Sequence, residues 1–101
     1  MKFKTINPAT EEVIDEYGLM PKEEVLDAAK KSHAAFHEWK QLDISERAHY
    51  FRRLSQVLRG NKERYAGLMT LEMGKPIRQS LTEVEKCAWG AEVYADNAAK
   101  W

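Results

Sequence analysis

The chain has 101 residues, enough for one small domain or part of a larger one, and its 16 basic and 16 acidic side chains cancel. A neutral chain has no net field that would attract nucleic acid or an anionic membrane. No run approaches the roughly 18 apolar residues of a transmembrane helix, and Met1 to Lys4 lead into no secretory signal. The single cysteine excludes an intramolecular disulfide and is compatible with the reducing cytoplasm, where we expect the protein to reside.

Residues 1–20 predict a short β-hairpin. Phe3 to Ile6 has strand character, Asn7 to Thr10 reads as a turn, and Val13 to Tyr17 forms a second apolar run before Gly18. An isolated hairpin is marginally stable in water. We therefore expect it to dock on something larger.

The first predicted helix runs roughly from Pro21 to Lys40. Proline suits a first helical turn, and acidic residues follow it where they complement the helix dipole. Apolar residues then recur at spacings of three and four along one face: Val25, Ala29, Ser32, Phe36 and Trp39.

The second predicted helix opens on Asp43 and Glu46, which have the spacing of a capping box. Gly60 then interrupts its apolar stripe, either as a full break or as a kink, and Asn61 is placed to cap a further helix. Both alternatives remain open from the sequence.

Gly74 and Pro76 mark the corner of an αα-hairpin. Glycine can take the left-handed conformation that ends one helix, and proline suits the start of the next. The stripe beyond the corner is rich in alanine, which would allow a neighbouring helix to approach closely. Its members are Ile77, Leu81, Val84, Ala88, Ala91, Ala95 and Ala98.

The predicted fold is mainly α, with three to four amphipathic helices and a short N-terminal β-hairpin. We assign residues 1–101 to a single partial domain, with the hairpin in 1–20 and the helical region in 21–101. No glycine or proline ends the last helix before Trp101. We therefore expect the chain to be a segment of a longer protein.

Three motifs carry a family resemblance: Asn7-Pro8-Ala9-Thr10, Thr70-Leu71-Glu72-Met73-Gly74-Lys75-Pro76 and Glu83-Val84-Glu85-Lys86-Cys87. In this order they resemble the N-terminal part of NAD(P)-dependent aldehyde dehydrogenases, particularly those acting on succinate semialdehyde. The resemblance implies an oxidoreductase with an α/β Rossmann-like fold in its full length, which uses NAD or NADP to oxidise an aldehyde to the carboxylic acid. It also implies that this segment is structural and inactive alone. The alternative is a free-standing helical module for protein interaction or self-association, without enzymatic activity.

The catalytic residues of the resembled family do not match this chain. There, a cysteine in a Gly-Gln-x-Cys context attacks the aldehyde, hydride passes to the nicotinamide, and a glutamate-activated water hydrolyses the thioester. Cys87 lies between Lys86 and Ala88 on an amphipathic helix, so we expect it to be a small buried hydrophobe. No Gly-x-Gly-x-x-Gly is present to hold a pyrophosphate. We therefore expect no catalytic and no cofactor-binding residue in this chain.

Two further patterns have features of binding sites. His33 and His37 are four residues apart, which is an acceptable ligand spacing, but they form no His-Glu-x-x-His motif, and His49 lies on another helix. We expect surface histidines and no metal. The second pattern is a run of basic residues interleaved with aromatic ones, as in nucleic-acid-binding helices. We expect these side chains to be solvated or paired within the chain, with Glu46, Glu63 or acids of the last helix as partners: Arg47, Arg52, Arg53, Arg59, Lys62 and Arg64.

By analogy with the resembled family, Tyr94, Asn97 and Trp101 would approach an incoming aldehyde. We expect Tyr94 and Trp101 simply to pack in a core instead, and assign them no site. As partners we expect the missing remainder of the enzyme or a second copy of the chain, with neither nucleic acid nor membrane.

Overall fold

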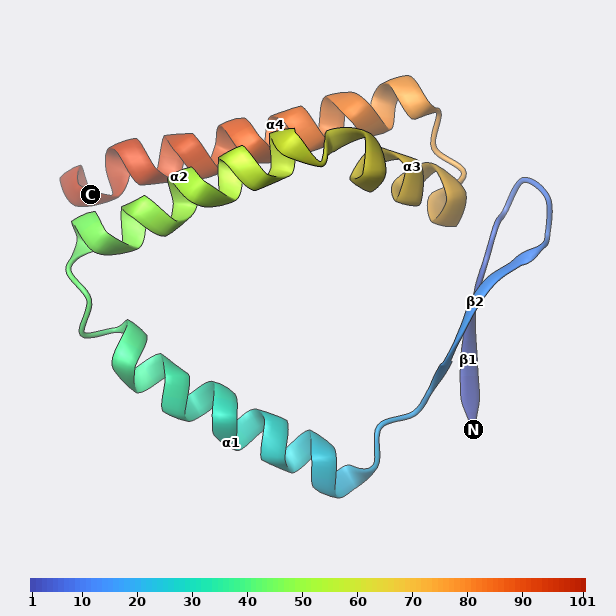
Figure 1. The fold of residues 1–101 in the computed structure, drawn as a ribbon, viewed down its shortest axis with the longest axis horizontal. Coiled ribbons are helices and arrows are strands. Elements are labelled where there is room, and N and C mark those ends of the chain that lie inside the picture. The colour runs from blue at the N-terminus through green and yellow to red at the C-terminus, as the bar shows by residue number, and fades with distance from the viewer.

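The computed structural model describes all residues 1–101 and confirms a mainly helical chain with an N-terminal hairpin (Figure 1). Its elements are β1 (Lys2–Ile6), β2 (Val13–Gly18), α1 (Lys22–Trp39), α2 (Ile44–Gly60), α3 (Lys62–Met73), α4 (Ile77–Asn97) and a closing 3₁₀ turn (Ala98–Lys100).

The hairpin pairs β1 with β2 in antiparallel register. Phe3 lies opposite Tyr17, and their rings stack with centroids 5.2 Å apart. Asn7 shapes the turn: its Oδ1 accepts a hydrogen bond from the backbone N–H of Ala9 at 2.9 Å, and its carbonyl accepts from Glu11 at 2.8 Å. The turn predicted at Asn7 to Thr10 is confirmed, because an asparagine side chain can substitute for a backbone turn in this way.

The starts of α1 and α2 follow from their local sequences. Pro21 is the N-cap of α1, and the helix matches its predicted range within one residue at each end. Asp43 and Glu46 form the predicted capping box, in which the N–H of Asp43 donates to Glu46 Oε2 at 3.1 Å.

Asn61 and Asn97 end helices, which the sequence analysis did not foresee. At the α2–α3 junction only Asn61 lies outside the two helices, and its Nδ2 donates to the carbonyl of Val57 at 2.9 Å. Its side chain thus caps the end of α2, not the start of α3. Asn97 likewise donates to the carbonyl of Val93 at 2.8 Å, so α4 ends there and does not run on to Trp101.

The core lies where α2 and α3 pack along α4 (Figure 1). Only eight residues are buried, and none is larger than valine: Ala48, Ser55, Ala66, Ser80, Val84, Ala88, Ala91 and Ala95. The close approach predicted from the alanines is confirmed. The larger Leu54 and Leu68 remain about half exposed.

Helix α1 stands apart from this layer, and none of its residues is buried (Figure 1). Its main link is at its end, where the ring of Trp39 lies 5.2 Å from that of Tyr50. The radius of gyration is 17.7 Å, whereas a compact domain of this length has about 13 Å. The accessible surface is 8247 Å², against about 5,900 Å² for a folded monomer of this mass. The chain is therefore open.

None of the helices combines the length and the apolar character that crossing a membrane requires.

Candidate functional site

The best-defined tertiary junction is the α3–α4 corner. Gly74 has φ 69° and donates its N–H to the carbonyl of Thr70 at 3.0 Å, as predicted for a left-handed helix end. A Cβ at Gly74 would lie 2.8 Å from Cγ of Pro8 in the hairpin turn. The Asn-Pro-Ala-Thr turn thus packs against the glycine corner, so two motifs far apart in the sequence meet in space.

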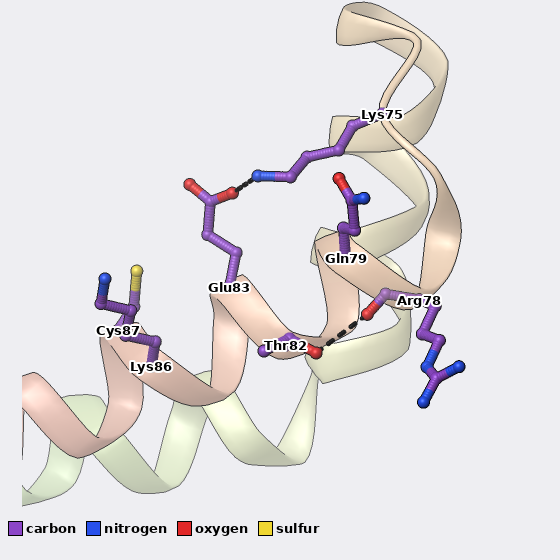
Figure 2. A pocket seen from close by; sticks show the side chains of 7 residues that line it. All are labelled: Lys75, Arg78, Gln79, Thr82, Glu83, Lys86 and Cys87. Atoms are coloured by element: carbon purple, nitrogen blue, oxygen red, sulfur yellow. Dashed lines mark hydrogen bonds and ion pairs between the residues drawn. The ribbon is translucent and has the colours of Figure 1, made fainter.

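Beside this corner, the first half of α4 borders an open hollow of about 910 Å³ (Figure 2). Its lining is mostly polar: Lys75, Arg78, Gln79, Thr82, Glu83, Lys86 and Cys87. Figure 2 shows Lys75 reaching across to pair with Glu83, and Thr82 Oγ1 donating to the carbonyl of Arg78 at 3.0 Å. The Lys75 ammonium holds the pKa of Glu83 below its usual range through its hydrogen bond and its charge. The hollow therefore has a basic rim, with its one carboxylate already paired.

Cys87 lies at one end of this hollow and is exposed, so its expected burial was wrong. Cys87 is exposed because its neighbour Ala88 faces the core. Consecutive helical residues point about 100° apart, so Cys87 is turned away from that core. No histidine lines the hollow that could act as a base towards the thiol. Its geometry offers a binding surface, not a nucleophile–base pair.

The sequence did not lead us to expect a binding surface at the polar residues of this hollow. Their signal was available in the spacing of four that joins Arg78, Thr82 and Lys86 in one row and Gln79, Glu83 and Cys87 in the next.

A charged cluster joins α2 and α3 to α4. Arg59 Nε donates to Glu85 Oε1 at 2.8 Å, and its terminal nitrogens bond to Glu92. Ser55 is buried and donates to Glu92 Oε1 at 2.9 Å, while Lys62 contacts Glu85 at 3.4 Å. The Arg59 hydrogen bonds lower the pKa of both glutamates.

A second cross-helix ion pair joins Arg52 Nη2 to Asp96 Oδ1 at 3.1 Å. The expectation that basic side chains of α2 pair with acids of α4 is therefore confirmed for Arg52 and Arg59.

The three histidines lie in two places. His33 and His37 are exposed neighbours on α1, with their Nε2 atoms 3.0 Å apart. His49 is on α2 beside Tyr50, with ring centroids 6.2 Å apart. No group of three or more histidine, cysteine, aspartate or glutamate side chains converges on a point where a metal would sit.

The aromatic pair at the end of α4 is not in a core, contrary to our expectation. Tyr94 is 59% exposed and Trp101 is 78% exposed, and their rings meet edge to face with centroids 5.9 Å apart. Tyr94 also borders an apolar hollow of about 250 Å³, together with Trp39 and Phe51.

A family model for the aldehyde dehydrogenase family matches residues 1–101, the whole chain. The probable succinate-semialdehyde dehydrogenase [NADP(+)] of Synechocystis is 34% identical over 101 residues, which are 100% of this chain and 22% of that protein. The mitochondrial succinate-semialdehyde dehydrogenase of Arabidopsis thaliana is 38% identical over 98 residues, or 97% of this chain and 19% of that protein.

Among solved structures, succinic semialdehyde dehydrogenase from Streptococcus pyogenes, in complex with NADP⁺, superposes with a TM-score of 0.89 at 31% identity. The match covers 97% of this chain and 22% of that one. The chain thus spans about a fifth of the length of the relatives it matches. From the corner motif, the helical layer and the match over its full length, this chain belongs to the aldehyde dehydrogenase family.

Proposed function

We propose that residues 1–101 form the N-terminal structural segment of an NAD(P)-dependent aldehyde dehydrogenase whose substrate is succinate semialdehyde. The proposal rests on the difference between the matched share of this chain and the matched share of its relatives. The family model accounts for every residue of the chain, yet the chain accounts for about a fifth of its relatives. We take the substrate and NADP⁺ from the relatives, which are named as succinate-semialdehyde dehydrogenases and as NADP⁺-dependent or NADP⁺-bound.

The open fold supports a structural role. The chain exposes about 2,300 Å² more surface than a compact protein of its mass. Its exposed side chains include apolar residues from every main element, among them Phe3, Val25, Phe36, Leu54, Leu68 and Tyr94. The remainder of the enzyme would cover such surfaces, with 1–20 as the hairpin and 21–101 as the helical region of one partial domain.

The chemistry of the segment supports inactivity when it is alone. Cys87 lacks the sequence context of the family nucleophile and has no base beside it. The glycines form no phosphate-binding turn. The whole enzyme would bring the catalytic cysteine, the glutamate and the NAD(P) site, and we place it in the cytoplasm, with neither nucleic acid nor membrane as a partner.

Calorimetric titration of the purified 101-residue protein with NAD⁺ and NADP⁺ tests this proposal. We expect no binding of either dinucleotide and no reduction of NAD(P)⁺ with succinate semialdehyde. Binding at micromolar concentrations would overturn the structural role.

A second candidate is a self-associating helical module without enzymatic activity, favoured by the same exposed faces. Sequencing the gene past the Trp101 codon separates the two. A continuing reading frame whose product reduces NAD(P)⁺ with succinate semialdehyde supports the enzyme, and a stop codon supports the module.

A further inference from the structure

Two imidazoles lie one turn apart on the exposed surface of α1. The Nε2 atoms of His33 and His37 are 3.0 Å apart, and the rings meet nearly at right angles, with centroids 4.5 Å apart. Both residues belong to one regular helix, so the helix backbone sets their spacing without help from any other element. The pair therefore exists in the chain as it stands, whether or not the rest of an enzyme is present.

The distance between these nitrogens suits a shared metal ion. A transition metal binds imidazole nitrogen at about 2.0–2.1 Å. Two nitrogens 3.0 Å apart then subtend an angle of about 90° at the ion, the angle between neighbouring ligands in square-planar and octahedral complexes. A tetrahedral ion would need a separation of about 3.4 Å. The geometry therefore fits Cu²⁺ and Ni²⁺ better than Zn²⁺.

We propose that His33 and His37 form a bidentate site for a divalent transition-metal ion, with Cu²⁺ preferred. No third protein ligand converges on the pair, so water completes the coordination. In the free protein one Nε2 donates to the other. On metal binding the proton of that ring is on Nδ1 in place of Nε2, so that the Nε2 lone pair is free for the ion. The site departs from our sequence-based expectation of no metal, because the sequence spacing alone did not show that the two nitrogens lie 3.0 Å apart.

The test is calorimetric titration of the 101-residue protein with Cu²⁺ in a buffer that does not chelate the metal. The variants are His33→Asn and His37→Asn, and His49→Asn is the matched control, because it removes an exposed imidazole from another helix. We expect one Cu²⁺ per chain in the parent and in His49→Asn. Each α1 variant should bind about tenfold more weakly or worse.

Two further readouts distinguish a ligand from a structural residue. Circular dichroism should show unchanged helix content in all three variants, since the replaced side chains are exposed. The electron paramagnetic resonance spectrum of bound Cu²⁺ should show splitting by two nitrogens in the parent and in His49→Asn. If only the histidine nitrogens and water bind the ion, Cu²⁺ should bind most tightly. Ni²⁺ and Zn²⁺ should bind more weakly, with nearly equal affinities.

Copper binding that survives both α1 substitutions, or that His49→Asn weakens equally, would overturn the proposal. Tighter binding of Zn²⁺ than of Cu²⁺ would contradict the angle of about 90° between the two nitrogens at the ion, on which the proposal rests.

Discussion

Gly74 shows how one residue can join two parts of the chain. Its positive φ ends α3, and its missing side chain leaves room for Pro8. Any other residue here would be unfavourable for two reasons. Its Cβ would strain the left-handed backbone, and the same Cβ would clash with Pro8. The glycine therefore serves the local turn and the docking of the hairpin together.

We expect Gly74→Ala to lower the free energy of unfolding by about 2 kcal/mol, through backbone strain and the contact with Pro8. Gly90→Ala is the control: a Cβ there meets nothing within 4 Å, and the change should stabilise α4 by about 0.5–1 kcal/mol. Urea denaturation measures both. Equal effects from the two substitutions would contradict this account of the corner.

Cys87 gives a second test at the scale of one residue. Because the side chain is exposed, we expect Cys87→Ala to change stability by less than about 0.5 kcal/mol. The thiol should also react with a thiol reagent in the native protein as completely as in urea. Val84→Ala, at a position that is 1% exposed, should cost about 2 kcal/mol. A Cys87 that reacts only after unfolding would contradict the exposed placement.

At the scale of elements, the charged cluster holds α2 against α4 over a core of small residues. Ser55 contributes a hydroxyl where most neighbouring core positions hold alanine, and it links the carboxylate of Glu92 to Arg59. Small residues bring the helices close but bury little apolar area each. The ion pairs therefore matter more to this contact than they would beside a core of large side chains.

This cluster predicts a dependence of stability on pH. The pKa values of Glu85 and Glu92 are lowered, first through hydrogen bonds from Arg59. Groups with a lowered folded-state pKa contribute stability that is present above the ordinary glutamate pKa of about 4.3 and is lost as the pH falls through the folded pKa. We expect Tm to fall with decreasing pH in this range.

The matched comparison uses Arg59→Gln and Arg53→Gln. The first should flatten the fall of Tm between about pH 5 and about pH 3, because it removes the hydrogen bonds that lower both pKa values. Arg53, on the same helix, makes none of these contacts, so its variant should keep the parental slope. Identical Tm profiles for Arg59→Gln and the parent protein, measured by circular dichroism, would show that the cluster is not coupled to folding.

At the scale of the whole molecule, the open arrangement leaves apolar faces without partners. The exposed set includes Phe36, Trp39, Tyr17 and Trp101. Covering about 400 Å² of such surface would contribute on the order of 10 kcal/mol before the entropy of association is subtracted. An isolated chain can obtain this cover only from another copy.

We therefore expect the 101-residue protein to self-associate, as a dimer formed through these residues or by exchange of a helix or the hairpin. Sedimentation across a hundredfold range of concentration should show mass increasing with concentration. Phe36→Glu should weaken association, whereas Lys30→Glu, which also introduces a carboxylate but on the polar side of α1, should not. A compact monomer that melts cooperatively at every concentration would refute this expectation.

The sequence by itself determined the features that depend on near neighbours along the chain. The capping box of Asp43 and Glu46, the left-handed Gly74 and the helical stripes were all predicted, because these interactions close within a turn or so of backbone. The family resemblance rested on the same local motifs and is confirmed. The alanine spacing on α4 predicted that a neighbouring helix approaches closely, and the structure shows that α2 and α3 do so.

Only the tertiary structure decided which faces are covered and which distant residues meet. Cys87, Tyr94 and Trp101 looked like core residues because they are apolar or small, but burial depends on a partner element, and none covers them. The contact of Pro8 with Gly74 joins segments with no shared periodicity, so no local pattern could reveal it. Hydrophobic spacing records which side of a helix prefers cover, whereas the arrangement of the other elements decides whether that cover is present.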